Sequence, residues 1–89
     1  MLVRSTGGRS AGMLSAYVLI QTEVGKAGQV AEAIRGIDGV QRAEDMTGPY
    51  DVIARVQASG MDELGRLVVA RIQAVDGVTR TLTCTMIRR

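Results

Sequence analysis

The sequence of 89 residues contains no histidine, tryptophan or phenylalanine, and it has only one cysteine and one proline. A lone cysteine cannot form an intramolecular disulfide, and the usual zinc sites need histidine or several cysteines. Catalytic pairs that need a histidine base are also excluded. Small chains without disulfides or metals often gain stability by oligomerisation, and a hydrophobic content of 46% agrees with that. We therefore expect an oligomer without enzyme activity, cofactor or metal.

Basic residues are too few and too scattered for a nucleic-acid surface. The formal net charge is +2, but four arginines lie near the two ends of the chain. Residues 13–87 carry seven basic against nine acidic side chains, a net charge of −2. The only aromatic residues are two tyrosines, so stacking platforms for bases are also scarce. The composition argues against direct binding of nucleic acid.

The chain lacks an apolar run of membrane-spanning length, and its N-terminus lacks the apolar segment of a secretory signal. We read residues 1–12, which are rich in Gly, Ser and Arg, as a disordered leader or an artificial start. These features predict a cytoplasmic protein, in which Cys84 is a reduced thiol and is read as a core residue.

Apolar periodicity predicts the order βαββαβ. Strands are expected at 15–23, 40–46, 51–57 and 78–87, with amphipathic helices at 27–37 and 61–75. An alignment of the chain with itself that places Ile34 on Ile72 gives nine identities between 16–47 and 54–85, which indicates two copies of one β-α-β unit. Right-handed crossovers then predict an α+β, ferredoxin-like fold. Its antiparallel sheet has the order 4-1-3-2, with both helices on one face.

The other face of this sheet is the expected interface between copies of the chain. The last strand alternates apolar residues with threonines. We place the apolar set, which includes Leu82 and Cys84, toward the helices, and Thr81 and Thr83 on the open face. Packing of two sheets about a two-fold axis would cover that face. The alternative is that the threonines only reflect the preference of this residue for strands.

The segment Thr47–Asp51, with the sequence TGPYD, joins the two units and is not explained by the repeat. Gly48 can supply an unusual backbone angle, and the following proline rigidifies the turn. N–H groups of such a turn could receive a carboxylate, and Asp51 could accept from an ammonium group. Tyr50 offers a ring and a hydroxyl. The alternative is a plain hairpin turn with an exposed tyrosine.

The stretches AYVLIQTEVG, IDGV, AEDMTGPYDVIARV and DELGRLVVARIQAVDGVTRTLTCTMI closely resemble the effector-binding domain of Lrp/AsnC transcriptional regulators. The resemblance covers residues 13–89, which we take as one ligand-binding domain. It implies dimers that form through their sheets, often assembled as tetramers of dimers, with amino acids bound between subunits. Matched by position, it implies that five residues line the cleft: Gly48, Tyr50, Asp51, Thr81 and Thr83.

Full-length regulators of that family carry a helix-turn-helix domain ahead of this one, whereas about a dozen irregular residues precede the first strand here. We therefore expect a stand-alone module that senses an amino acid and is linked to transcriptional regulation without touching DNA. The alternative is a structural adaptor that co-assembles with full-length relatives and binds no small molecule. A small enzyme is the weakest reading, because the chain offers no histidine base.

Overall fold

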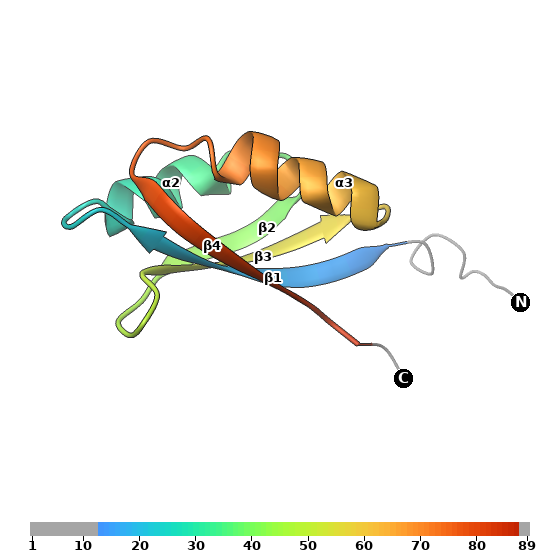
Figure 1. The fold of residues 1–89 in the computed structure, drawn as a ribbon, viewed down its shortest axis with the longest axis horizontal. Helices are drawn as coiled ribbons and strands as arrows, with labels where there is room; N and C mark the ends of the chain where they lie inside the picture. Colours follow the sequence, from blue (N-terminus) through green and yellow to red (C-terminus); the bar gives the residue numbers. More distant parts are fainter. Residues whose placement is uncertain (1–12, 88–89) are drawn as a thin grey trace, which may run out of the picture.

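The computed structural model describes residues 13–87, which form one four-stranded sheet with helices on one face (Figure 1). The elements in chain order are β1 (Leu14–Thr22), α2 (Ala27–Arg35), β2 (Val40–Asp45), β3 (Val52–Ala58), α3 (Met61–Arg66), the π-helix η1 (Leu67–Ile72) and β4 (Val78–Thr85). The strands are antiparallel in the order β2-β3-β1-β4. The predicted ferredoxin-like fold is confirmed. The leader assigned to residues 1–12 lies outside the described residues.

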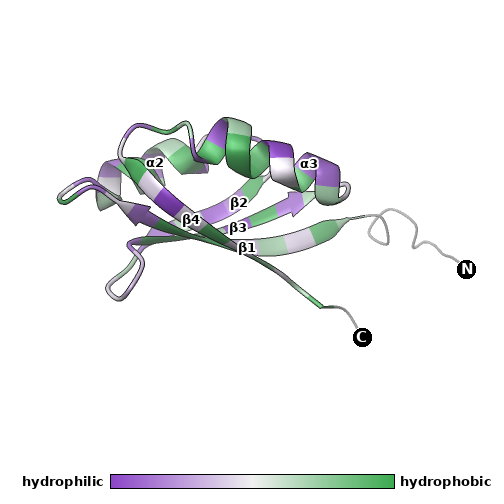
Figure 2. Ribbon diagram, viewed as in Figure 1, coloured by the Kyte–Doolittle hydropathy of each residue, from purple (hydrophilic) through white to green (hydrophobic). Residues whose placement is uncertain are grey.

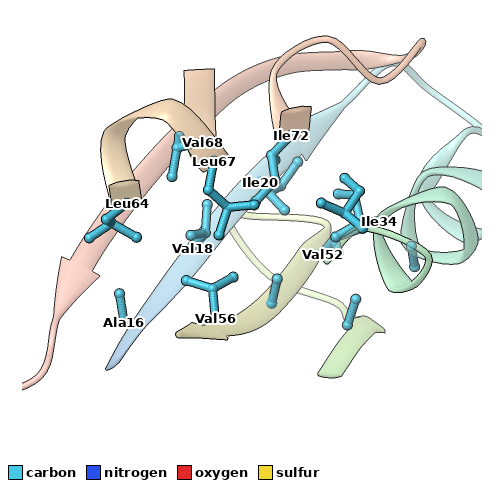
Figure 3. Packing of buried hydrophobic residues seen from close by; sticks show 14 of the residues in the cluster. Ala16, Val18, Ile20, Ile34, Val52, Val56, Leu64, Leu67, Val68 and Ile72 are labelled. Atoms are coloured by element: carbon cyan, nitrogen blue, oxygen red, sulfur yellow. The ribbon is translucent and has the colours of Figure 1, made fainter. Parts of the chain in front are cut away.

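The core lies between the sheet and the helices. Both helices carry hydrophobic and hydrophilic residues side by side (Figure 2), and their apolar sides point to the sheet (Figure 3). Ile34 of α2 and Ile72 of η1 are fully buried together with Val18 and Ile20 of β1. The amphipathic period predicted for both helices therefore places one stripe of each helix against the same sheet face.

An Asp-Gly turn ends each helical segment and leads into the edge strand. Gly39 and Gly77 have φ values of 95° and 99°, a region in which glycine is favoured over other residues. The Gly39 carbonyl accepts from the Gln57 N–H at 2.9 Å, and the Gly77 carbonyl accepts from the Glu23 N–H at 2.8 Å. These bonds tie each turn to the end of a central strand.

A β-bulge interrupts β4 near its start. Val78 pairs with Thr22, but the next pair is Arg80 with Gln21, so Thr79 is an extra residue in β4. Strand alternation has a period of two, and one inserted residue moves all later side chains to the opposite face. The strictly alternating pattern of the sequence is therefore not one continuous face in the structure.

The bulge reverses the faces that we predicted for β4. Thr81 and Thr83 pair with Ile20 and Val18 of β1. Directly paired residues of an antiparallel sheet share a face, and these two partners are buried under the helices (Figure 3). The threonines lie on the helix side, and the prediction that they line the open face is wrong.

The open face instead carries Leu82 and Cys84, the apolar residues of β4 that follow the bulge. Leu82 pairs with Leu19, and Cys84 pairs with Tyr17. Leu82 is 46% exposed. Cys84 is also exposed, so the prediction that it is a core residue is wrong. The guanidinium of Arg55 lies 5.8 Å from the centre of the Tyr17 ring, within range of a cation–π contact. The open face is thus more apolar than the sequence pattern suggested.

Candidate functional site

The Thr47–Asp51 turn projects from one end of the sheet, on the side away from the helices (Figure 1). Its ends are closed by a hydrogen bond from the Met46 N–H to the Asp51 carbonyl at 2.8 Å. Gly48 has a φ of 155°, which confirms the unusual backbone angle predicted for it. A Cβ at this glycine would meet no neighbour, so the backbone angle rather than space favours glycine.

Asp51 fixes this turn to the end of β1. Its N–H donates to the Ile20 carbonyl at 2.8 Å, and its carboxylate oxygen Oδ2 accepts from the Thr22 N–H at 2.8 Å. The side chain of Gln21 adds a bond to the Pro49 carbonyl at 3.1 Å. Within residues 13–87, the other carboxylate oxygen of Asp51 makes no hydrogen bond. Asp51 thus presents a positioned carboxylate where the turn meets β1.

Asp51 lines a groove of about 590 Å³ at this end of the sheet. The end of β1, the following loop and the start of α2 form most of its wall, and Thr79 completes it. Glu23 also lines the groove, but the Lys26 ammonium lies 3.5 Å from its carboxylate. Asp51 makes no ion pair with any residue of the described range. It is therefore the groove acid that remains free to receive a cation.

The Lys26 ammonium joins two segments beside this groove. It lies 3.4 Å from Asp76 of the second turn and 3.5 Å from Glu23. The hydrogen bond and negative charge of Asp76, followed by those of Glu23, raise the pKa of Lys26 above its ordinary value. This side chain holds the groove wall together and carries a full positive charge at neutral pH.

Thr81 lines a neighbouring groove of about 360 Å³ that also contains Thr79 and Gln73. Its hydroxyl oxygen accepts from the Gln73 Nε2 at 2.8 Å, so the hydroxyl hydrogen is left to donate. Thr83 is exposed and lies two residues further along β4. Thr79 lines both grooves and connects them.

The structure brings together only part of the predicted site. Asp51 and Thr81 lie on either side of Ile20 in β1, about 10 Å apart if strands are spaced by about 4.8 Å. Gly48 and Tyr50 lie in the projecting turn and do not line the Asp51 groove. Sequence reasoning assigned no role to Thr79, although its place directly after the Asp-Gly-Val turn is repeated in the first unit.

Residues 13–87 show no group of three or more acidic or cysteine side chains that could hold a metal ion. In the same range, no helix combines the length and apolar character needed to cross a membrane.

Two curated relatives share most of this domain. An uncharacterized HTH-type transcriptional regulator of Pyrococcus abyssi is 38% identical over 55 residues, which cover 62% of this chain and 37% of the regulator. The homocitrate synthase of Sulfurisphaera tokodaii is 32% identical over 60 residues, which cover 67% of this chain and 13% of the enzyme. The matched part thus spans little more than a third of the regulator and a small part of the enzyme.

Solved structures agree with the fold. The Thermus thermophilus protein TTHA0845 superposes with a TM-score of 0.80 at 33% identity, covering 85% of this chain and 95% of that protein. A Neisseria meningitidis transcriptional regulator, solved as a complex with L-methionine, has a TM-score of 0.79 at 15% identity. That match covers 99% of this chain and 59% of the regulator, and it supports the fold alone.

The model of the Lrp/AsnC ligand binding domain matches residues 15–89, nearly the whole chain. The match includes the TGPYD turn, the Asp51 groove and β4 with its bulge. This chain belongs to the Lrp/AsnC ligand-binding domain family.

Proposed function

We propose that this protein is an amino-acid sensor that binds its effector in the Asp51 groove and passes the signal on through an oligomer. The observation that carries the proposal is the Asp51 carboxylate. One of its oxygens is held by the Thr22 N–H at 2.8 Å, and the other has no hydrogen bond within residues 13–87. A carboxylate that is fixed in this way, in a groove without a second free acid, suits an ammonium group.

The remaining wall of the groove suits the rest of an amino acid. The Thr79 hydroxyl can donate to a carboxylate, and the Thr81 hydroxyl lies in the adjoining groove. Val24 and Ala27 offer apolar surface for a side chain. A volume of about 590 Å³ is within the usual range for small-molecule sites. A Neisseria meningitidis regulator of the same fold was solved with L-methionine, which belongs to the effector class that we propose.

A second subunit would complete this site. In one chain the predicted residues lie on both sides of β1, and Gly48 and Tyr50 reach beyond the groove. The open face of the sheet, with Leu82 46% exposed, supports dimerisation through the sheets. Further association into tetramers of dimers would bring projecting turns to neighbouring subunits. We therefore place Gly48, Tyr50 and Thr83 at contacts between subunits.

We propose that the protein acts in the cytoplasm and regulates transcription without contacting DNA directly. The net charge of −2 over residues 13–87 gives no electrostatic footprint for nucleic acid. The match to homocitrate synthase covers only 13% of that enzyme, so it gives no reason to place an enzyme activity in this domain. The second candidate is an adaptor that joins HTH-type relatives through the apolar sheet face and binds no small molecule.

A thermal-shift screen with the twenty amino acids tests the sensor. At one hundred times its dissociation constant, an effector should stabilise the protein by about 2.7 kcal/mol. Asp51→Asn should abolish this shift, because the amide keeps an acceptor for the Thr22 N–H but loses the charge. Asp62→Asn, which removes the same charge from exposed α3, should leave it unchanged. Absence of a shift with every amino acid at millimolar concentration would favour the adaptor.

Sedimentation analysis tests the assembly. Leu82→Glu places a charge on the open sheet face and should shift the protein toward monomers. Val69→Glu is the matched control, because Val69 is an exposed apolar residue on η1, away from that face. Equal masses for the wild type and both variants would show that the sheet face is not the dimer interface.

A further inference from the structure

A second groove lies at the other end of β3, between the turn of the first unit and the helix of the second. It has a volume of about 340 Å³. Asp38 of the turn faces it from one element, and Glu63, Arg66 and Arg71 from α3 and η1. Leu67 and Ala70 give it an apolar part. The groove combines both signs of charge with apolar surface in a volume that suits a small molecule.

The π-helix η1 accounts for the two arginines in this groove. Arg66 and Arg71 are five positions apart, a spacing that separates side chains on an α-helix, where residues three or four apart are neighbours. Here the Gln73 N–H donates to the Val68 carbonyl at 2.8 Å, a bond over five positions that is typical of a π-helix. The wider turn allows Arg66 and Arg71 to line the same groove. Such π segments occur frequently at functional sites.

The charged side chains of this groove have fewer partners than those at the Asp-Gly turn of the second unit. Asp76 of the second unit is paired with Lys26 at 3.4 Å. Asp38, its counterpart, has no ion pair within residues 13–87. The same holds for Arg66 and Arg71, which also make no side-chain hydrogen bond there. Two guanidinium groups and a carboxylate thus line one groove with their binding capacity unused.

We propose that this groove is a second ligand site, which takes a small zwitterion of the α-amino-acid class. Arg66 and Arg71 hold the carboxylate, for which guanidinium groups are suited. Asp38 holds the ammonium group, and Leu67 and Ala70 contact the side chain. Glu63 is partly engaged, because its carboxylate accepts from the Ser59 N–H. This site lies apart from the Asp51 groove and does not depend on the function proposed there.

Titration of the isotope-labelled full chain, followed through its backbone amide NMR signals, tests the site. L-alanine is the zwitterionic probe, and acetate and methylamine carry its two charged groups separately. L-alanine should shift the signals of Gly39 and Ala70, with weaker effects from acetate and methylamine. Arg66→Gln with Arg71→Gln should weaken this binding about tenfold or more, as expected for lost charged hydrogen bonds. Arg42→Gln with Arg80→Gln, an equal loss of two charges on the open face, should not weaken it.

The result that overturns the proposal is an unchanged Gly39 signal with L-alanine, or a shift that the double arginine variant retains. Acetate binding as tightly as L-alanine would overturn the role of Asp38. The Asp51→Asn variant separates the two sites, because it should leave the Gly39 shift intact. A protein that loses the signals of the Asp51 groove but keeps those of Gly39 therefore supports this site and contradicts only the other.

Discussion

The two β-α-β units share their edge-strand geometry but differ in their helices. Each edge strand begins with an Asp-Gly turn, continues with a bulge, and is bound to the end of its helix by a side chain. Arg35 Nε donates to the Ala43 carbonyl at 2.8 Å, and Gln73 Nε2 donates to the Thr81 hydroxyl oxygen at 2.8 Å. The alignment that places Ile34 on Ile72 also relates these two pairs. The duplication has thus kept the connection between helix and edge strand.

The two units differ in length, and the difference lies in their helical segments. Val40 and Val78 begin the two edge strands, and they pair with Val56 and Thr22 of the central strands. The chain from Val56 to Val78 in the second unit is longer than the chain from Thr22 to Val40 in the first, by about one helical turn. The extra length lies in the helical segment, which is nine residues long in α2 and continues from α3 through η1 in the second unit. The second unit thus has about one more helical turn between its two strands than the first, and its helical segment includes the π-helix η1.

Truncation of the two central isoleucines gives the largest expected effect. Ile34 and Ile72 are repeat-related and fully buried. Ile34→Ala and Ile72→Ala should each lower the free energy of unfolding by about 2–5 kcal/mol, measured by urea denaturation. Similar losses would show that both helices hold the same core equally. A loss below about 1 kcal/mol for Ile72→Ala alone would show that the π-helix can close around the cavity, against our expectation.

The two Asp-Gly turns should be the next most sensitive pair. Alanine at Gly39 or Gly77 would have to adopt a positive φ, at a cost of about 1–2 kcal/mol before any clash. At Gly39 a Cβ would lie 3.2 Å from the backbone oxygen of Gln57, which is fixed in the sheet. At Gly77 the near atoms belong to side chains, so Gly39→Ala should destabilise more. Gly36→Ala is the control, because Gly36 has a φ of −82° that alanine can adopt. An equally large loss of stability in this control would show that the positive φ is not the cause.

One glycine in each helix should be replaceable with a gain. A Cβ at Gly28 of α2 or Gly65 of α3 would meet no neighbour within 4 Å. Gly28→Ala and Gly65→Ala should each stabilise the protein by about 0.5–1 kcal/mol, because alanine loses less backbone entropy on folding. Thermal unfolding measures both. If only Gly65→Ala destabilises, the transition from α3 to η1 needs the freedom of glycine, and the two helices differ more than we infer.

The smallest expected effect is a difference in the pH dependence of the two units. The Ser59 N–H lowers the pKa of Glu63, so this stabilisation is present at neutral pH and disappears as the pH falls through the lowered pKa. Asp76 and Glu23 raise the pKa of Lys26, so that stabilisation disappears as the pH rises through the raised pKa. In a plot of the free energy of unfolding against pH, Glu63→Gln should reduce the slope on the acid side. Lys26→Met should reduce the slope on the alkaline side. Unchanged slopes would contradict these assignments.

The sequence was sufficient for the fold because each element has a clear apolar period and a glycine-containing turn at its end. Ile34 and Ile72 identified the two helices, and the strand order followed from handedness. The repeat was partly misleading, however. The alignment of identical residues places Val18 on Val56, whereas the strand pairing makes Thr22 the structural counterpart of Val56.

The site was less predictable because it depends on one inserted residue. Nothing in the alternation after Val78 marks Thr79 as a bulge, so Thr81 and Cys84 were assigned to the wrong faces. Asp51 was predicted as an acceptor for an ammonium group, but its bond to the Thr22 N–H depends on the register of β1, which local sequence does not contain. The second groove was also missed, since a π-helix leaves no periodic signal in so short a segment.

The bulge at Thr79 also determines how this strand responds to a change in length. Loss of this single codon would remove the bulge but keep the pairs of Val78 with Thr22, Arg80 with Gln21 and Thr81 with Ile20. Leu82 and Cys84 would stay on the open face and the threonines on the helix side, because pairing with β1 decides the face of each residue. The deletion would only straighten the start of β4, since a bulge bends its strand and increases the local twist. A domain of this kind can therefore lose one residue at this position without changing the composition of either sheet face.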